Sequence, residues 1–243
     1  KGPHASGTYA VCVVAMRFPM SEGFPLLTVR KIGFKSILRE LLWILSGSTN
    51  IFHLQKRGAH FWDQWVEPSD TLHQAIGFTG RPHGDLGPVY GHQFRNFGAR
   101  RNEFGQYSTN GFDQVDWVVT MLKNHPTSRR IMMTTWNPDD FNAPNGSERV
   151  FIAPCHGSLL HFYCTPDKKL TLHHVQRSGD VPIGIPFNIA EYALFLLLVA
   201  QATNLEPFEL VHTISDAHIY SNQISAMREL IVREPKKLPT VCV

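Results

Sequence analysis

The sequence predicts an α+β fold in a single domain that spans residues 1–243. Two observations lead to this expectation. With 43% hydrophobic residues over 243 positions, the chain can bury one sizeable core. Strand-like and helix-like segments also mix without a regular βαβ alternation, which favours a mixed sheet covered by helices over a doubly wound parallel sheet. We find no internal repeat, low-complexity tract or clear linker that would divide the chain.

The first half of the chain predicts a strand, two helices and a long loop. Residues 9–18 are β-branched and apolar, which is typical of a strand. Residues 34–45 place apolar side chains at helical spacing, and Gly47 is a plausible stop. Asn50 is expected to cap a short helix. Residues 68–107 are rich in glycine and are expected to form a loop.

The second half predicts more strands, together with one long apolar helix. That helix covers residues 186–203, with proline in its first turn, where no main-chain hydrogen bond is lost. The other expected elements are a helix with apolar residues at positions 115, 118, 119 and 122, strands at 130–136, 159–164, 170–175 and 208–215, a loop at 137–149 and a helix at 222–233.

Charge and cysteine content exclude several classes of protein. The formal charge is only +3, so a nucleic-acid partner is not expected, whereas a small anionic ligand fits. The four cysteines form no C-x-x-C pair, which favours reduced thiols in a cytoplasmic protein. The sequence shows no apolar leader, and its longest apolar run, residues 192–200, is too short for a membrane span of ~20 residues. No membrane partner is therefore expected.

One cysteine is a candidate nucleophile. Cys155 lies between a loop and a strand in Pro-Cys-His, where a cysteine is more often a small buried hydrophobe. A nucleophilic thiolate needs positive charge nearby, and Arg129, Arg130 and Arg177 could supply it. Such arginines are usually solvated or salt-bridged, but their planar forks also suit a dianionic phosphate.

Polar residues near the long helix could recognise a nucleotide. Asn188 stands near the helix start and reads first as a cap, although its amide could also match the O4 and N3–H edge of uracil. His218 and Tyr220 share one face of an extended segment, as ordinary core polar groups or as ligands of sugar hydroxyls.

A carboxylate and two tryptophans form a further candidate set. Glu40 is flanked by apolar residues, and a buried carboxylate with a raised pKa suits proton transfer. Trp62 and Trp65 are core aromatics by default but could form a wall against a flat pterin. The histidines form no metal signature, and adjacent His173 and His174 face opposite ways in a strand, so no metal site is expected.

The order of these motifs along the chain resembles the thymidylate synthase family. The resemblance runs from about residue 7 to about residue 239. It rests on Trp-Asp-x-Trp, Gly-Pro-Val-Tyr-Gly, Ser-Arg-Arg, Pro-Cys-His, Gln-Arg-Ser-Gly-Asp, Pro-Phe-Asn-Ile-Ala and Asp-Ala-His-Ile-Tyr-Ser-Asn, with Glu-Leu-Leu-Trp, Gly-Phe-Pro-Leu and Arg-Glu-Pro in support.

The resemblance implies a fold, a partner and a set of roles. The fold is that of a single-domain α+β enzyme that forms a homodimer packed sheet against sheet, with active sites shared between subunits. The implied catalytic residues are Cys155, Glu40, Tyr90, Asn188, Arg177 and Asp180. The implied dUMP-binding residues are Arg129, Arg130, Gln176, Arg177, Ser178, Asn188, His218 and Tyr220. The implied folate-binding residues are Trp62, Trp65, Asp180, Ile183, Gly184 and Phe187.

The reaction implied by the resemblance is reductive methylation of dUMP to dTMP, with 5,10-methylenetetrahydrofolate as co-substrate and no metal. Two alternatives stay open. A deoxypyrimidine hydroxymethylase shares the fold, the cysteine and the folate, but water rather than hydride captures the methylene. A non-catalytic nucleotide- or RNA-binding relative would be expected to lack Cys155 or Asn188, and both are present.

Three departures from the family pattern bear on these alternatives. The stretch 3–8 reads Pro-His-Ala-Ser-Gly-Thr, where an arginine and a Thr-Gly-Thr-Gly loop are expected. The loop at 137–154 is longer than expected. The family pattern also implies a further segment and a short apolar tail after Val243, so we expect that the C-terminal tail is missing.

Overall fold

The computed structural model describes residues 7–68, 71, 82–99, 107–141 and 152–243. The described chain forms two compact units. Unit 1 comprises Lys1–Ile37, Val119–Met132 and Cys155–Val243, and unit 2 comprises Leu38–Val118 and Met133–Pro154. The expectation of one domain over the whole chain stays a prediction.

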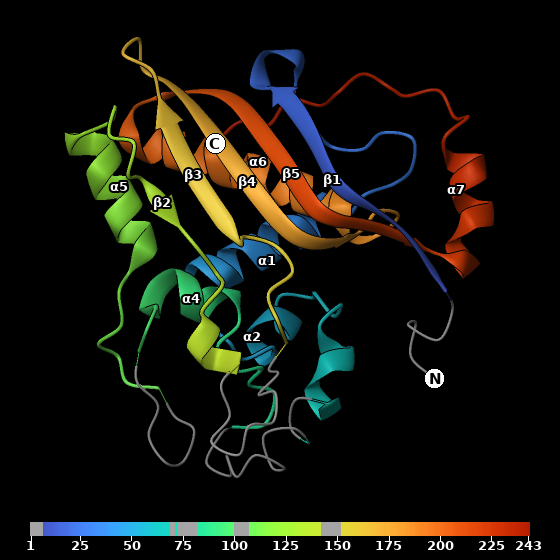
Figure 1. The fold of residues 1–243 in the computed structure, drawn as a ribbon, viewed down its shortest axis with the longest axis horizontal. Coiled ribbons are helices and arrows are strands. Elements are labelled where there is room, and N and C mark those ends of the chain that lie inside the picture. Colours follow the sequence, from blue (N-terminus) through green and yellow to red (C-terminus); the bar gives the residue numbers. More distant parts are fainter. Residues whose placement is uncertain (1–6, 69–70, 72–81, 100–106, 142–151) are drawn as a thin grey trace. The chain divides into compact units, whose positions relative to one another are not determined.

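Unit 1 is built on a mixed sheet of five strands in the order β1-β5-β4-β3-β2 (Figure 1). The strands are β1 (Thr8–Pro19), β2 (Met132–Met133), β3 (Leu159–Cys164), β4 (Lys169–Asp180) and β5 (Glu206–Tyr220). The pair β4 and β5 is parallel, whereas β1 runs antiparallel to β5 and β3 antiparallel to β4. The predicted α+β class with a mixed sheet is therefore confirmed.

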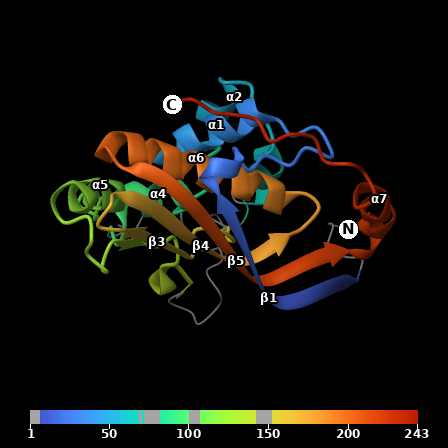
Figure 2. The same cartoon turned by 90° about the horizontal axis from the view of Figure 1, so that it is seen from above.

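The helix α6 (Gly184–Thr203) packs along one face of this sheet, against β4 and β5 (Figures 1 and 2). Its sequence is apolar all round, so it is buried on most sides. Phe195 of α6 meets Phe162 of β3 edge to face, with ring centroids 5.9 Å apart. The helix ends at Asn204, whose left-handed φ of 56° closes the last turn.

In the described part of the chain, α6 is the one helix long and apolar enough to cross a membrane. However, 61% of that apolar stretch is buried inside the structure. We therefore describe α6 as the core helix of unit 1.

The helices and strands differ from the predicted elements in three main respects. The remaining helices are η2 (Met20–Glu22), α1 (Phe34–Leu45), α2 (Phe52–Gln55), η3 (Asp63–Trp65), α4 (Tyr90–Asn96), α5 (Gln114–Asn124), η4 (Pro138–Phe141), η5 (Ser221–Gln223) and α7 (Ile224–Leu230). The predicted bounds of α1 are confirmed. The expected cap by Asn50 is wrong in position, because Ile51 is the N-cap of α2 and carries no side-chain cap hydrogen bond. Asn50 lies one residue earlier, where its Oδ1 accepts a hydrogen bond of 2.9 Å from the main-chain N–H of Phe52.

The first difference is α4, which lies inside the stretch 68–107 that was expected to be a loop. Much of that stretch lies outside the described residues, but Tyr90 and Phe94 of α4 are almost fully buried. Gly91 lets the helix approach the loop before α2, because a Cβ there would stand 2.6 Å from the carbonyl oxygen of Ser48. Tertiary packing therefore outweighs the loop-like composition.

The second difference is that the strand expected at 130–136 has only the two residues of β2. Gln114 explains this. Its amide donates to the Thr134 carbonyl at 2.7 Å and accepts from the Thr134 N–H at 2.9 Å. A side chain thus takes both main-chain groups that would continue the ladder.

The third difference concerns the lengths of two strands and one helix. The strands expected at 170–175 and 208–215 extend to Asp180 and Tyr220, so both carry their polar motifs inside β-structure. The helix expected at 222–233 is shorter and follows the 3-10 turn η5. The lengthened β4 and β5 set up the candidate site, because parallel neighbours bring Ser178 opposite Asp216 and Asp180 opposite His218.

Candidate active site

The turn that carries Cys155 is tied to β4 through main-chain groups. Cys155 is half-buried, and its carbonyl oxygen accepts a hydrogen bond of 3.2 Å from the N–H of Ser178. Gly157 adopts a left-handed φ of 67°, which favours glycine, and its N–H donates to His174 Nε2 at 2.9 Å. The local conformation around the thiol is therefore set by contacts inside unit 1.

The orientation of the Asn188 amide follows from its neighbour Gln176. Gln176 Nε2 donates to the Ser178 carbonyl oxygen at 3.0 Å, and a carbonyl can only accept, so the NH₂ group of Gln176 must face that way. The same NH₂ group donates to Asn188 Oδ1 at 3.0 Å. The amide nitrogen of Asn188 thus remains available as a donor, and Oδ1 retains a second lone pair. This arrangement matches a uracil O4 and N3–H edge.

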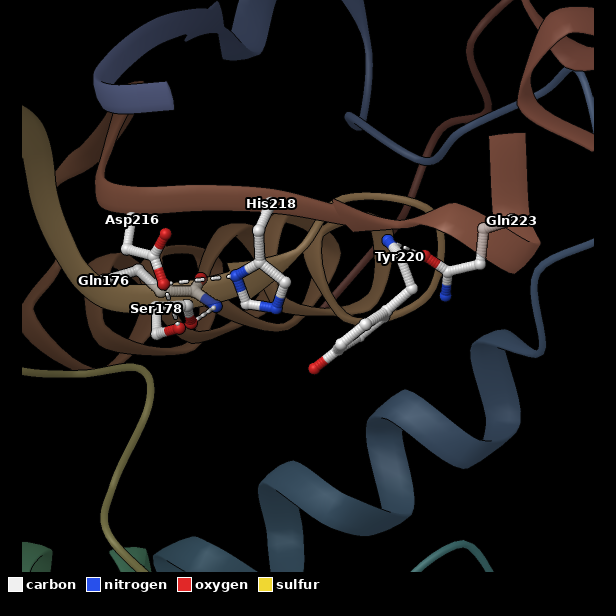
Figure 3. A network of polar contacts seen from close by, with 6 residues as sticks. All are labelled: Gln176, Ser178, Asp216, His218, Tyr220 and Gln223. Atoms are coloured by element: carbon white, nitrogen blue, oxygen red, sulfur yellow. Dashed lines mark hydrogen bonds and ion pairs between the residues drawn. The ribbon is translucent and has the colours of Figure 1, made fainter. Parts of the chain in front are cut away.

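A second polar group links the ends of β4 and β5 (Figure 3). Asp216 Oδ2 accepts a hydrogen bond of 2.9 Å from Ser178 Oγ and lies 3.2 Å from His218 Nδ1. Because a carboxylate only accepts, His218 carries a proton on Nδ1. Asp216 therefore orients both the serine hydroxyl and the imidazole.

Tyr220 continues this group along β5, and its side chain lies on the same side of the strand as that of His218 (Figure 3). Their ring centroids are 5.3 Å apart. Burial, and then the charges of Asp180 and Asp216, raise the pKa of Tyr220, so its hydroxyl remains a donor at neutral pH. Tyr220 and His218 can thus bind sugar hydroxyls together.

Gln223 anchors Asp180 and the end of β5. Its Oε1 accepts from the Tyr220 N–H at 2.9 Å, and its Nε2 donates to both carboxylate oxygens of Asp180, at 3.3 and 3.1 Å. Asp180 also accepts from the Ile183 N–H at 3.2 Å. The carboxylate is thereby fixed at the start of α6. We call Gln176, Ser178, Asp180, Asn188, Asp216, His218 and Tyr220 the β4–β5 cluster.

Three arginines of unit 1 lie where an anionic ligand could reach them. Arg177 is exposed on β4, and Arg129 and Arg130 are exposed just before β2. Ser178, the residue that follows Arg177 on β4, belongs to the β4–β5 cluster. A dianionic phosphate requires such cations, so the structure is compatible with the predicted phosphate role of Arg177.

The folate-binding residues predicted in unit 1 gather at the start of α6. Gly184 begins the helix, Ile183 precedes it with 58% of its surface exposed, and Phe187 follows in the first turn. Arg30 lies with its guanidinium carbon 6.0 Å from the Phe187 ring centroid, and its Nη2 donates to the Pro182 carbonyl oxygen at 2.7 Å. A flat apolar ligand could pack on Ile183, with a cation at its border.

In unit 2, Glu40 lies at the centre of a buried aromatic group. Its Oε1 accepts a hydrogen bond of 2.8 Å from the indole N–H of Trp62, and only 8% of the residue is exposed. Burial raises the pKa of Glu40 to about 7, although the Trp62 hydrogen bond acts in the opposite direction. The Trp62 ring lies 6.0 Å from both Trp43 and Tyr90. We call Glu40, Trp43, Trp62 and Tyr90 the Glu40 cluster.

The two predicted pterin-stacking tryptophans differ in exposure. Trp65 in η3 is 39% exposed, so its ring can meet a ligand, whereas Trp62 is 9% exposed and uses its N–H to hold Glu40. A stacking role for either ring stays a prediction. Among the described residues, no three histidine, cysteine, aspartate or glutamate side chains gather in a metal-binding arrangement.

The sequence did not predict three residues of the candidate site. Asp216, Gln223 and Arg30 each hold a predicted site residue in place. Asp216 could have been found, because it shares a strand face with His218. Arg30 and Gln223 could not, because they act on Phe187 and Asp180 from distant segments.

Comparison with known proteins finds one family over nearly the whole chain. The family model described as Thymidylate synthase matches residues 3–243. A protein of Aster yellows witches'-broom phytoplasma (strain AYWB) named Thymidylate synthase is 43% identical over 249 residues, covering 96% of this chain and 80% of its own length. A protein of the same name from Phytoplasma mali (strain AT) is 40% identical over 250 residues, again covering 96% of this chain and 80% of its own length.

Proposed function

We propose that this chain, which belongs to the thymidylate synthase family, uses Cys155 as the covalent nucleophile of a methyltransferase that makes dTMP from dUMP. The observation that carries the assignment is the Cys155 turn, bonded through Ser178 to the strand that holds Gln176 and Asp180. The proposed co-substrate is 5,10-methylenetetrahydrofolate, which supplies both the carbon and the hydride.

The proposed steps give each cluster a task. Thiolate addition from Cys155 to C6 of the pyrimidine breaks the ring conjugation and makes C5 nucleophilic. Negative charge then develops at O4, where the Asn188 amide donor, already oriented by Gln176, stabilises it. Arg177, Arg129 and Arg130 bind the phosphate.

The sugar and the protons are assigned to the remaining residues. His218 and Tyr220 bind the deoxyribose, Ile183, Gly184 and Phe187 contact the folate, and Asp180 anchors it. Glu40 and Tyr90 handle protons and ordered water. The raised pKa of Glu40, about 7, supports the proton role because it lies near the working pH of a cellular enzyme.

C5 is proposed to attack the methylene carbon of the co-substrate, after which a general base removes the C5 proton and the folate is expelled, leaving an exocyclic methylene on the pyrimidine. Hydride from tetrahydrofolate, rather than water, is proposed to add to this methylene as the bond between C6 and Cys155 breaks. Both reported relatives carry the name Thymidylate synthase, so the hydroxymethylase and non-catalytic alternatives are not favoured. Incubation with dUMP and methylenetetrahydrofolate should give dihydrofolate, followed by absorbance, and a methylated nucleotide, identified by mass. Tetrahydrofolate with a hydroxymethylated nucleotide would show that water captures the methylene.

The Asn188→Asp variant should shift preference from dUMP toward dCMP. A protonated aspartate can present a donor and an acceptor suited to the 4-amino edge of cytosine, whereas the ionised form loses the donor that uracil O4 needs. The loss of kcat/KM for dUMP should correspond to about 1–3 kcal/mol, as for other lost buried polar matches. Steady-state kinetics with both nucleotides checks this, and an unchanged ratio would mean that Asn188 does not read the base.

The homodimer is proposed to form through the sheet face that points away from α6. Half-exposed or exposed apolar side chains lie on that face, including Leu159 and Tyr163 of β3, Val175 of β4 and Val211 of β5. In Figure 1 this face is turned toward the viewer, with α6 behind it. A cytoplasmic location is proposed with it, and the four free cysteines support that location.

The shared site predicts complementation between two inactive variants. If Arg130 serves the partner's phosphate, an Arg130→Ala subunit paired with a Cys155→Ala subunit has one intact site. Random subunit exchange should then restore about a quarter of wild-type activity, because half of the dimers are hybrids with one working site of two. Activity is measured after mixing and exchange. An Arg130→Ala and Cys155→Ala double variant, mixed with wild-type protein at the same dilution, provides the control.

Two results would contradict this arrangement. A mixture that stays inactive although hybrid dimers are detected would show that Arg130 acts within its own subunit. A monomer in sedimentation at the assay concentration would exclude the shared site altogether.

A further inference from the structure

Three histidines and a tyrosine form a buried chain behind Cys155, on the α6 side of the sheet. His174 on β4 and His212 on β5 are completely buried, and their Nδ1 atoms lie 3.1 Å apart. Tyr192 of α6 stacks on His174, with ring centroids 3.7 Å apart, and its hydroxyl lies 2.8 Å from His156 Nδ1. None of these four residues has a role in the proposed reaction.

The proton positions in this chain follow from one main-chain group. The Gly157 N–H can only donate, so His174 Nε2, 2.9 Å away, must be the acceptor and carries no proton. Neutral His174 then has its proton on Nδ1 and donates it to His212 Nδ1. His212 in turn carries its proton on Nε2, which is buried without a hydrogen-bond partner among the described residues.

Both imidazoles are neutral at physiological pH. Burial, and then the neighbouring His212, His156 and His173, hold the pKa of His174 well below its ordinary value. Burial, and then His173, lower the pKa of His212 to about 4. A neutral His174 is required here, because a doubly protonated imidazole would point an N–H at the Gly157 N–H.

We propose that His174 is a positioning residue for Cys155, and that His212 holds His174 in the tautomer that accepts from Gly157. The main chain around the thiol is thereby fixed at two points. The Cys155 carbonyl oxygen accepts a hydrogen bond from the Ser178 N–H, and the Gly157 N–H donates one to His174 Nε2. Misplacement of a reacting atom by ~1 Å can cost on the order of 10²-fold in rate. The effect falls on thiol attack, because the predicted phosphate, sugar and base contacts come from other residues.

The matched pair His174→Gln and His174→Met tests the acceptor. Glutamine and methionine have similar length, both remove the imidazole, and only glutamine can place an acceptor near the position of Nε2. We expect His174→Met to lower kcat by about 10- to 100-fold with KM for dUMP changed by less than about threefold. His174→Gln should recover most of that loss.

The pair His212→Asn and His212→Leu tests the tautomer. Asparagine keeps an acceptor near the position of Nδ1, whereas leucine leaves the buried His174 Nδ1–H without an acceptor and so destabilises the tautomer that accepts from Gly157. His212→Leu should therefore lower kcat and His212→Asn should not. These variants leave His174 in place, so they keep the inference testable if His174→Met does not fold.

The inference rests on the proposed role of Cys155, and two measurements separate their failures. Adduct formation by the wild-type protein with 5-fluoro-dUMP and the folate tests Cys155 alone. Chemical shifts of ¹⁵N-labelled histidine test the tautomers without turnover, and His174 should be in its Nδ1–H form. Equal kcat for His174→Gln and His174→Met, a loss confined to KM, or an Nε2–H form of His174 would each overturn the proposal.

Discussion

The Cys155→Ala variant should lose turnover by on the order of 10⁴-fold or more, while dUMP still binds. In the proposed reaction the thiolate makes the covalent bond to C6, and no other step can replace it. The proposed phosphate, sugar and base contacts come from Arg177, His218 and Asn188, which the substitution does not touch. Nucleotide binding by calorimetry and turnover by dihydrofolate absorbance measure the two effects separately.

Covalent trapping makes the assignment specific to one cysteine. With 5-fluoro-dUMP and methylenetetrahydrofolate, the wild-type protein should gain the mass of nucleotide plus folate, because fluorine at C5 cannot leave as a proton does. Cys242→Ala, which removes an exposed cysteine far along the chain, should give the same adduct as the wild type. An adduct that persists in Cys155→Ala would assign the nucleophile to another residue.

Local sequence patterns predicted those helices and strands that are specified by their own residues. The apolar spacing of α1, the β-branched run of β1 and the continuous apolar stretch of α6 each specify an element without help from distant residues. The motif order further pointed to every member of the β4–β5 cluster except Asp216.

The features that the sequence did not predict depend on contacts between segments that are far apart in the chain. The helix α4 forms because Gly91 fits against Ser48, and β2 stops because Gln114 occupies Thr134. Local propensity does not encode such long-range contacts. The links between His174, His212 and Gly157 arise in the same way. The pattern placed His173 and His174 on opposite strand faces, but only the fold shows that His174 meets the turn behind Cys155.

The Glu40→Gln variant should lose activity and gain stability, and the two changes have one physical cause. Burial raises the pKa of Glu40 from 4.5 to about 7, so near neutral pH the carboxyl can both hold and release a proton. Glutamine cannot do this, and kcat should fall by about 10²- to 10⁴-fold, the usual contribution of a general acid or base. The inflection near pH 7 in the kcat profile should disappear with it.

The sign of the stability change follows from proton linkage. Between pH 4.5 and about 7 the folded wild-type protein binds more protons at Glu40 than the unfolded chain does, so its stability falls as pH rises. Above pH 7 the buried carboxylate is ionised, at a cost on the order of 3 kcal/mol. Glutamine avoids this cost and keeps an amide oxygen for the Trp62 N–H. The variant should therefore be more stable than the wild type at pH 8 and equal to it near pH 4.5.

Denaturant unfolding at the two pH values tests the raised pKa of Glu40, and kcat measured from pH 5.5 to 9 tests its proton transfer. The control is Glu67→Gln, which changes an exposed glutamate of the same unit and should alter neither quantity by much. A stability gain of equal size at both pH values would contradict the raised pKa of Glu40. A variant with wild-type kcat and an unchanged inflection would remove Glu40 from proton transfer. If the Glu40→Gln variant loses activity and gains stability only at high pH, two conclusions follow together. The buried carboxylate of Glu40 destabilises unit 2, and the reaction uses its proton.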